Sequence, residues 1–187
     1  MESLATAFFI AALALVGKVL FDEWNRQHER RSIAGGLAGE ISAYLSFFER
    51  RDAAAAYRKI AALPREDRRR RLAAFPQLPS GHPVFDTVAG KLGMLSAAHA
   101  HDVSRIYNIV TGMRLLLTNL SSPKFLDADD EYQKAMLENI AATIDQEVPT
   151  ARSLVTALEE VAREKPFAGQ LQFLLRSTSW ATRRRMQ

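Results

Sequence analysis

The sequence predicts an all-α protein, with one N-terminal transmembrane helix followed by an antiparallel bundle of about four long helices. Residues after position 31 show no sustained alternation of polar and apolar side chains and no Asn-Gly or Asp-Gly hairpin signal. Apolar residues recur there at spacings of three and four, which is typical of helices. With 9 Gly and 7 Pro in 187 residues, the chain is also too poor in turns for a β-sandwich or barrel.

The composition is that of a folded domain and excludes several classes of site. Hydrophobic residues make up 48% and charged residues 25%, which excludes a wholly disordered chain. The absence of cysteine excludes a disulfide scaffold, a cysteine-ligated metal and a cysteine nucleophile. The net charge of +4 is uneven, because residues 122–165 hold five basic and ten acidic side chains. Residues 166–187 hold four basic side chains and no acidic one, so pairing between segments is favoured over one basic face for nucleic acid.

The first element is an apolar helix over residues 4–21, in which only Thr6 and Lys18 are polar. A helix of this length spans about 27 Å, close to the roughly 30 Å hydrocarbon core of a bilayer. We expect a transmembrane anchor here; a cleaved signal peptide, a buried core helix and an interfacial helix are the alternatives. The anchor residues are Leu4, Phe8, Phe9, Ile10, Leu13, Leu15, Val16, Leu20, Phe21 and the interfacial Trp24.

The charges that flank the anchor predict its orientation. No Lys or Arg precedes it, whereas basic residues follow or end it, namely Lys18, Arg26, Arg30 and Arg31. The positive-inside rule then places the N-terminus outside and the C-terminal domain in the cytoplasm. We divide the chain into an anchor with a charged stalk (1–31), a bundle domain (32–180) and a basic tail (181–187).

The bundle elements follow from periodicity and from glycine and proline. Gly35, Gly36 and Gly39 predict a hinge or a helix restart after the stalk. A second helix is expected over residues 37–63, ended by Pro64, and a short third one over 65–74. A proline-rich loop (75–83) leads to a long helix over 83–120 with a heptad-like apolar seam. A fifth helix over 129–164 is expected to be capped by Asp127 or Asp129, and a sixth helix begins near residue 166.

A polar step interrupts the apolar seam of the long helix at His99 and Asp102. The two residues are three apart and share a helix face, so we expect a hydrogen-bonded structural pair in the bundle. A pH-sensitive polar layer is one alternative. A metal-dependent or other enzymatic site that also uses His82 and His101 is another. The sequence assigns no catalytic, metal-binding or cofactor-binding residue.

Two arginine clusters form candidate basic surfaces. The first is Arg65, Arg68, Arg69, Arg70 and Arg71, and the second is Arg183, Arg184 and Arg185 beside Trp180. Both clusters fit a solvated helix face or tail, pairing with the acidic fifth helix, or contact with anionic lipid, and the second also fits a tail that binds a partner. Nucleic-acid binding is the least favoured reading, because only Phe75 lies near the first cluster as a stacking partner.

The chain, with its predicted membrane helix, its stalk and two short motifs, resembles a recurring class of small bacterial single-pass membrane proteins of uncharacterised function. The matching residues are Gly39, Glu40 and Ile41 after the stalk, then Val84, Phe85, Gly90, Leu92, Leu95, Ile106 and Tyr107. The resemblance covers most of the chain from the anchor to about residue 120. It implies a bacterial inner membrane and a helical cytoplasmic domain, and it carries over no catalytic residue.

The sequence therefore favours a membrane-tethered interaction or scaffold protein that is not an enzyme and has no cofactor. Its expected partners are the membrane, which it spans once, and a protein that is either unknown or a second copy of the chain. An enzymatic effector and a binder of anionic lipid or nucleic acid through residues 65–71 are the alternative functions.

Overall fold

A computed structural model describes residues 2–73 and 81–164, and the predicted all-α class is confirmed for these residues. Every regular element in the described ranges is a helix. The helices are α1 (Glu2–Glu49), α2 (Ala53–Ala61), α3 (Arg65–Ala73), α4 (Pro83–Val88), the 3-10 helix η1 (Ala89–Met94), α5 (Ala97–Leu120), α6 (Pro123–Leu126) and α7 (Asp130–Arg163). The predicted helix from residue 166 and the basic tail 181–187 lie outside the described residues.

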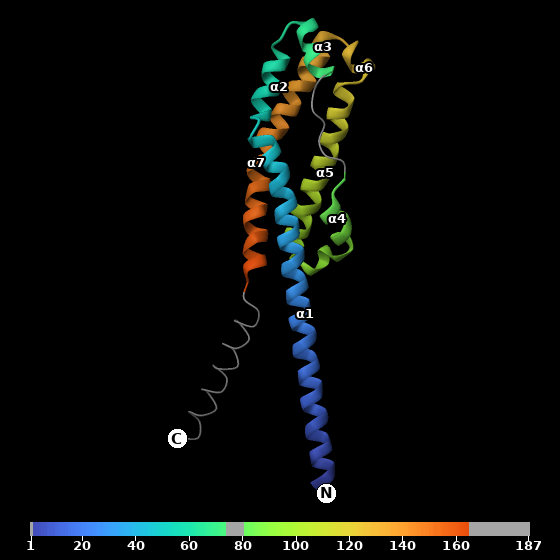
Figure 1. The fold of residues 1–187 in the computed structure, drawn as a ribbon, viewed down its shortest axis with the longest axis vertical. Coiled ribbons are helices and arrows are strands. Elements are labelled where there is room, and N and C mark those ends of the chain that lie inside the picture. The colour runs from blue at the N-terminus through green and yellow to red at the C-terminus, as the bar shows by residue number, and fades with distance from the viewer. Residues whose placement is uncertain (1, 74–80, 165–187) are drawn as a thin grey trace, which may run out of the picture.

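Three of these helices are long, and they form a bundle (Figure 1). The second half of α1 lies beside α7, and the two run in opposite directions. α5 runs parallel to α1 and completes the trio. α2 continues the path of α1 along α7, while α3 and α6 close the end that is farthest from the N-terminus. α4 and η1 lie on the flank near the opposite end.

α1 is one continuous helix of 48 residues, so the predicted hinge at Gly35, Gly36 and Gly39 is wrong. Of the three, Gly36 permits close packing, whereas nothing lies within 4 Å of a Cβ at Gly39. A Cβ at Gly36 would lie 3.1 Å from Cγ1 of Val84, and a Cβ at Gly35 would lie 3.6 Å from Cβ of Ala162. The contacts that α1 makes with α4 and α7 offset the poor helix propensity of glycine.

The predicted helix over residues 37–63 is wrong, because the chain breaks at residues 50–52. α1 ends at Glu49, and α2 begins at Ala53 after Asp52 adopts a left-handed conformation with φ of 42°. Aspartate tolerates this conformation better than most residues. The break turns the chain so that α2 can bury Tyr57 and Ile60. The short helix predicted over 65–74 is confirmed as α3.

The predicted helix over residues 83–120 is also wrong, because it divides into α4, η1 and α5. Two glycines lie within η1, Gly90 and Gly93, where they weaken an α-helical path. Leu95 is extended, and the Ser96 side chain accepts a hydrogen bond from the amide of His99, 3.1 Å away. Ser96 therefore starts α5 as its N-cap.

α7 agrees with the helix predicted over residues 129–164, and Asp129 caps it. The Asp129 carboxylate accepts hydrogen bonds from the amides of Glu131 and Tyr132, at 3.0 and 3.2 Å. α7 continues through Pro149 to Arg163. Its buried face contributes Leu137, Ile140, Ile144, Leu154, Leu158 and Val161 to the core. On α1, the core begins at Ile33, which is 5% exposed.

Candidate functional site

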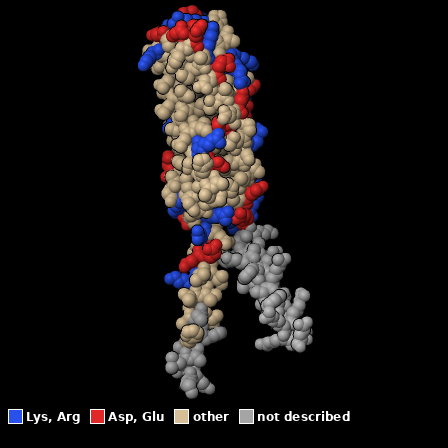
Figure 2. Space-filling view, turned by 180° about the vertical axis from the view of Figure 1, so that it is seen from behind, with Lys and Arg blue, Asp and Glu red and all other residues tan. Residues whose placement is uncertain are grey.

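The first part of α1 projects from the bundle as a lone helix, which we call the arm (residues 2–24). The large apolar side chains that the structure describes here are exposed, from 78% for Phe8 to 40% for Trp24. Figure 2 shows a largely uncharged surface on this projection and a band of charged residues where it meets the bundle. Eight predicted anchor residues are exposed here: Phe8, Ile10, Leu13, Leu15, Val16, Leu20, Phe21 and Trp24.

The structure does not test the predicted anchor as a whole. Among the residues that it describes, no helix has the length and apolarity needed to cross a membrane. The side chains of residues 1–7, 9 and 12 lie outside the described residues, and those of Leu4 and Phe9 belong to this set. The anchor therefore stays a prediction.

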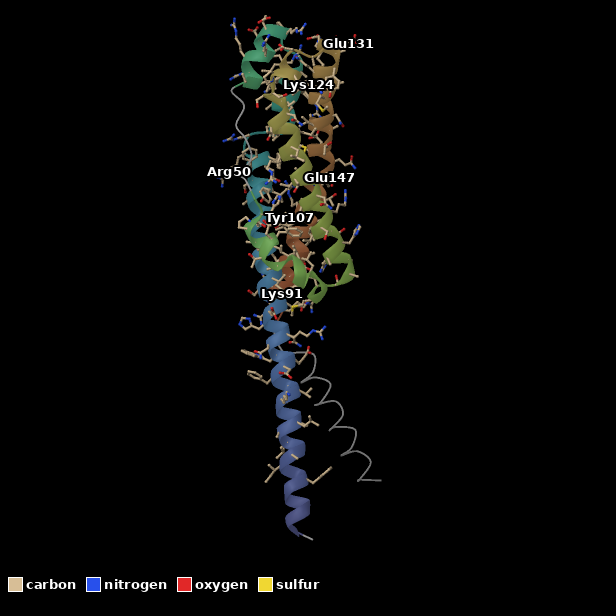
Figure 3. All side chains as sticks on the ribbon, turned by 90° about the vertical axis from the view of Figure 1, so that its right-hand side faces the viewer. Arg50, Lys91, Tyr107, Lys124, Glu131 and Glu147 are labelled. Atoms are coloured by element: carbon tan, nitrogen blue, oxygen red, sulfur yellow. The ribbon has the colours of Figure 1, made fainter. Side chains whose placement is uncertain are left out.

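An aromatic stripe marks the base of the arm. Phe21 stacks on Trp24 with 6.3 Å between ring centroids, and Trp24 meets His28 edge-on at 5.6 Å. The spacings of three and four residues place all three rings along one side of α1. Just beyond them, Glu29 pairs with Lys91 of η1 at 2.5 Å (Figure 3). The stripe thus lies where the arm meets the bundle.

The histidines predicted as an enzymatic region do not converge. His82 is buried, with Nδ1 2.8 Å from the Tyr44 hydroxyl and Nε2 2.9 Å from Oγ1 of Thr111. Thr111 lies twelve residues along α5 from His99, which separates them by about 18 Å. His101 is exposed on the same helix. The described residues contain no group of three or more His, Cys, Asp or Glu side chains that could hold a metal ion.

The predicted hydrogen-bonded pair of His99 and Asp102 is not formed either. Both side chains are half-buried, and the described structure contains no hydrogen bond between them. Nδ1 of His99 is buried without a partner. The start of α5 at residue 97 explains the difference, because both residues belong to the first turns of a capped helix and not to the middle of a long seam.

The structure instead assembles a polar network around Glu40, which sequence reasoning did not identify as a centre. The Glu40 carboxylate accepts hydrogen bonds from the amides of Val84 and Phe85, both at 3.1 Å, and from the Tyr107 hydroxyl at 2.5 Å. These amides belong to the first turn of α4, whose own N-cap residue makes no side-chain capping bond. Glu40 therefore caps α4 from another helix and satisfies amides that α4 cannot satisfy itself.

Two tyrosines next to this network have raised pKa values. Burial is the main cause for Tyr107, and the hydrogen bond to Glu40 adds to it, so its pKa lies well above the usual 10. Burial also raises the pKa of Tyr44, and the Glu40 charge raises it further. Phe85 stacks on the Tyr107 ring at 4.1 Å. Because both hydroxyls are neutral donors at physiological pH, the network serves to hold α4 against α1 and α5.

This network joins residues from both sequence motifs. Residues 39–41 and 84–85 and Tyr107 are far apart in the sequence, but the hydrogen bonds of Glu40 bring them together. One signal could have predicted this: Glu40 lies three residues after buried Leu37 and four before buried Tyr44. A carboxylate at the edge of such a buried stripe needs hydrogen-bond donors.

The first arginine cluster is largely engaged within the protein. Arg68 is fully buried, so its prediction as a surface residue is wrong. Its guanidinium contacts Asp130, Oε1 of Gln133 at 3.2 Å and the carbonyl of Ala61 at 2.9 Å. These contacts fasten the α2–α3 corner to the start of α7, and a buried charge requires such partners.

The remaining arginines of α3 are exposed, and two of them contact the segment before α7. Arg65 donates to the carbonyl of Ala128 at 3.1 Å, and Arg69 pairs with Asp127 at 3.1 Å. Arg70 and Arg71 face solvent. The whole of α3 lies at the end of the bundle opposite the arm (Figure 1). The second cluster, Arg183 to Arg185, lies outside the described residues.

An apolar crevice of about 40 Å³ opens between α5 and α7, with α1 as its floor. Ile109 and Met113 of α5 face Ile144 and Val148 of α7 across it. The volume would hold about three water molecules, but the lining offers them almost no polar partner, so apolar atoms fit it better. On its rim, Arg105 reaches both carboxylate oxygens of Glu147 at 2.6 and 2.7 Å.

Comparisons with known proteins give no relative for this chain. No protein-family model matches it, and neither the curated proteins nor the solved structures contain a match. The resemblance to bacterial single-pass proteins is therefore untested and stays an expectation. What is established is the all-α bundle itself, with a projecting apolar arm, a capping network and a crevice.

Proposed function

We propose that the protein is a membrane-tethered helical interaction module, in which the arm anchors the bundle to the bilayer. One observation carries the proposal: a single unbroken helix, α1, exposes large apolar side chains along residues 8–24 and buries its residues from Ile33 onward in the core. Exposed apolar area of this extent needs a cover. Moving eight large apolar side chains from water into lipid contributes on the order of 10 kcal/mol.

The charges around the arm support a cytoplasmic bundle. Lys18 lies one turn from the end of the apolar run, where its stem can carry the ammonium group to the headgroups. Trp24 stands at interfacial depth, and Arg26, Arg30 and Arg31 follow. With no Lys or Arg before the run, the rule for basic flanks favours an outside N-terminus. Together with the motif resemblance, this favours the inner membrane of a bacterium.

The arrangement of the bundle argues against the alternative functions. The enzymatic alternative needs His82 close to the other three residues, His99, His101 and Asp102. His82 contacts Thr111, which lies about 18 Å along α5 from His99. The nucleic-acid and lipid alternatives relied on residues 65–71, but Arg68 is buried and Arg65 and Arg69 are bound to the protein. We propose the crevice between α5 and α7 as the contact for a partner protein's apolar side chain, because its lining is almost wholly apolar.

Membrane fractionation of the full chain and of a charged variant tests the tether. In Leu13→Asp/Val16→Asp, two aspartates in the middle of the arm cost about 6 kcal/mol of insertion free energy. We expect the natural chain to resist alkaline extraction and to require detergent, and the variant to be released. Leu115→Asp/Tyr132→Asp is the matched control, because those side chains are equally exposed (60% and 52%, against 57% and 55%) but lie on the bundle.

The control variant should stay with the membrane. Release of the natural chain by alkali without detergent would contradict the tether. Equal release of both double variants would mean that folding, and not insertion of the arm, determines the fractionation.

A further inference from the structure

The crevice lies on a seam between α5 and α7, which run in opposite directions. Arg105 of α5 contacts Glu147 of α7 across this seam, and Figure 3 marks Glu147 beside α5. Because the two helices rise equally per residue, Ile109, four residues after Arg105, is level with Thr143, four residues before Glu147. Both of these residues line the crevice. The ion pair therefore fixes which residues face each other along the seam.

Apolar side chains continue the seam toward the far end of the bundle. By the same count, Leu116 of α5 is level with Met136 of α7. Ile109, Leu116 and Met136 are only half-buried, although all three pack against the core. The described lining of the crevice comes from α1, α5 and α7. The seam therefore presents apolar surface to the outside of the bundle.

The exposed residues that flank the seam carry no charge, although a quarter of the chain is charged. Glu138 and Asp145 belong to the other side of α7, where both pair with Arg58 of α2. The uncharged flanking residues are Asn108 and Leu115 on α5, and Asn139, Ala142 and Gln146 on α7. Figure 2 shows this side of the bundle as a largely uncharged surface, with charges gathered at its top and base. Depletion of charge is typical of the centre of a protein–protein interface.

Gly112 lies on the same face of α5, three residues after Ile109. A Cβ at this position would meet nothing within 4 Å, whereas a Cβ at Gly36 would meet Val84 at 3.1 Å. Glycine is a poor helix former, and packing within the described chain gives no reason for it here. The missing side chain instead leaves room for a helix that approaches from outside the chain.

The seam is complementary to a second copy of itself. When two copies face each other about a two-fold axis parallel to the bundle, α5 of one copy lies against α7 of the other with all levels unchanged. Arg105 then meets the partner's Glu147, and the apolar residues of the two seams meet each other. The tether requires an axis of this direction, because arms that cross one bilayer in the same orientation are related by rotation about the membrane normal. α1 is unbroken, so the bundle continues the direction of the arm.

We propose that the protein forms a homodimer through the seam of α5 and α7, in which each copy covers the crevice of the other and Arg105 of one copy pairs with Glu147 of its partner. This inference rests on the proposed tether. It names the partner of the crevice as a second copy of this chain. The centre of the dimer is then a four-helix bundle made of α5 and α7 from both copies.

Cross-linking between two singly substituted full chains tests the seam, because the chain has no cysteine of its own. Ile109→Cys and Thr143→Cys, carried on differently tagged chains, are produced in the same cells, and the membranes are treated with a short bismaleimide. We expect a cross-linked product that carries both tags, because the two positions face each other between copies. Ala43→Cys with Lys59→Cys is the control pair, exposed on α1 and α2, and should give little of this product.

Charge exchange tests the pairing of Arg105 with Glu147. With Arg105→Glu on both tagged chains, like charges face each other and the product should fall about tenfold. With Arg105→Glu on one chain and Glu147→Arg on the other, opposite charges face each other again, so the product should return. Recovery of this kind requires contact between chains, because each of these chains has like charges at its own two positions.

Gly112→Lys tests the close approach without weakening the single chain, because its Cβ enters open space and lysine is the better helix former. We expect the product to fall about tenfold while thermal stability is kept. Gly39→Lys is the matched control, since a Cβ at Gly39 also meets nothing within 4 Å, and should leave the product unchanged.

The possible failures are distinguishable. A chain that needs detergent for extraction, but gives no more product at the seam than at the control pair, contradicts the dimer alone. Cross-links at the seam in a chain that alkali releases support the dimer and contradict the tether. Cross-links from the seam to a different protein overturn the second copy as the partner. If Gly112→Lys leaves the product unchanged, the copies do not meet at this face.

Discussion

Replacing Glu40 by alanine tests whether the capping network holds the α4 flank in place. The change removes the acceptor of two α4 amides and of the Tyr107 hydroxyl. Loss of a capping side chain costs about 0.5–2 kcal/mol, and a buried hydroxyl left without a partner costs about 1–3 kcal/mol. Because the amides are only partly buried, water recovers some of this loss. We expect the free energy of unfolding to fall by about 2–4 kcal/mol.

Thermal unfolding and hydrogen exchange measure this effect. For a chain of this size, the expected loss lowers Tm by roughly 4–16 °C. The amides of Val84 and Phe85 should exchange faster, whereas those of α7 should change only with global stability. Glu29→Ala is the matched control on the same helix, because the Glu29 side chain is 42% exposed and pairs with Lys91. Its loss should cost less than about 1 kcal/mol.

A double-mutant cycle with Tyr107→Phe isolates the bond between the two side chains. We expect a coupling free energy of about 1–2 kcal/mol, because Tyr107 is 2% exposed and has few other partners for its hydroxyl. If Glu40→Ala costs no more than Glu29→Ala and the coupling is zero, Glu40 does not stabilise the packing of α4 against α1.

Three further outcomes follow from the structure. Burial raises the pKa of Tyr107 in the folded state above the unfolded value of 10.0, so the unfolded state loses this proton first as pH rises. The free energy of unfolding should therefore fall above pH 10. Denaturant titrations from pH 9 to 11 should show a smaller fall for Tyr107→Phe than for the natural chain. Arg68→Ala should lower the free energy of unfolding by about 3–5 kcal/mol and Arg70→Ala by less than about 0.5 kcal/mol, because only Arg68 is buried. Gly39→Ala should stabilise α1 by about 0.5–1 kcal/mol, whereas Gly36→Ala should gain less or destabilise, since only at Gly36 would a Cβ meet a neighbour closely.

The class of fold and the position of α7 could be predicted from local patterns. Apolar residues of α7 recur on one face for 34 residues, and Asp129 precedes them as a cap. Such signals lie within one element and need no knowledge of its neighbours. The same holds for α3, which Pro64 precedes directly.

The predicted hinge and the predicted helix over residues 83–120 are wrong because contacts between elements and local caps override the pattern of apolar spacing and helix propensity. Glycines at positions 35, 36 and 39 have poor helix propensity, yet α1 continues because α4 and α7 pack against it, most closely at Gly36. The long helix was predicted through residues 83–120 because the apolar spacing continues there. The Ser96 cap and the flexible Gly90 and Gly93 nevertheless divide it.

The candidate sites depended even more on tertiary structure. Arg68 lies in one run with Arg69 and Arg70, and only the fold turns it toward Asp130 and Gln133. The partners of Glu40 lie 44 to 67 residues away. Spacing within α1 places Glu40 at the edge of a buried stripe, but no rule within one element could have identified the partners of Glu40 or of Arg68.

Labelling of single cysteines from the two sides of the membrane tests the central claim most directly. Glu2→Cys marks the start of the arm and Lys124→Cys the far end of the bundle, on an otherwise cysteine-free chain. If the arm spans the membrane, an impermeant maleimide should label Glu2→Cys in intact cells after the outer membrane is opened, and Lys124→Cys only after the inner membrane is opened. Equal labelling of both positions before the inner membrane is opened would contradict the tether and its orientation.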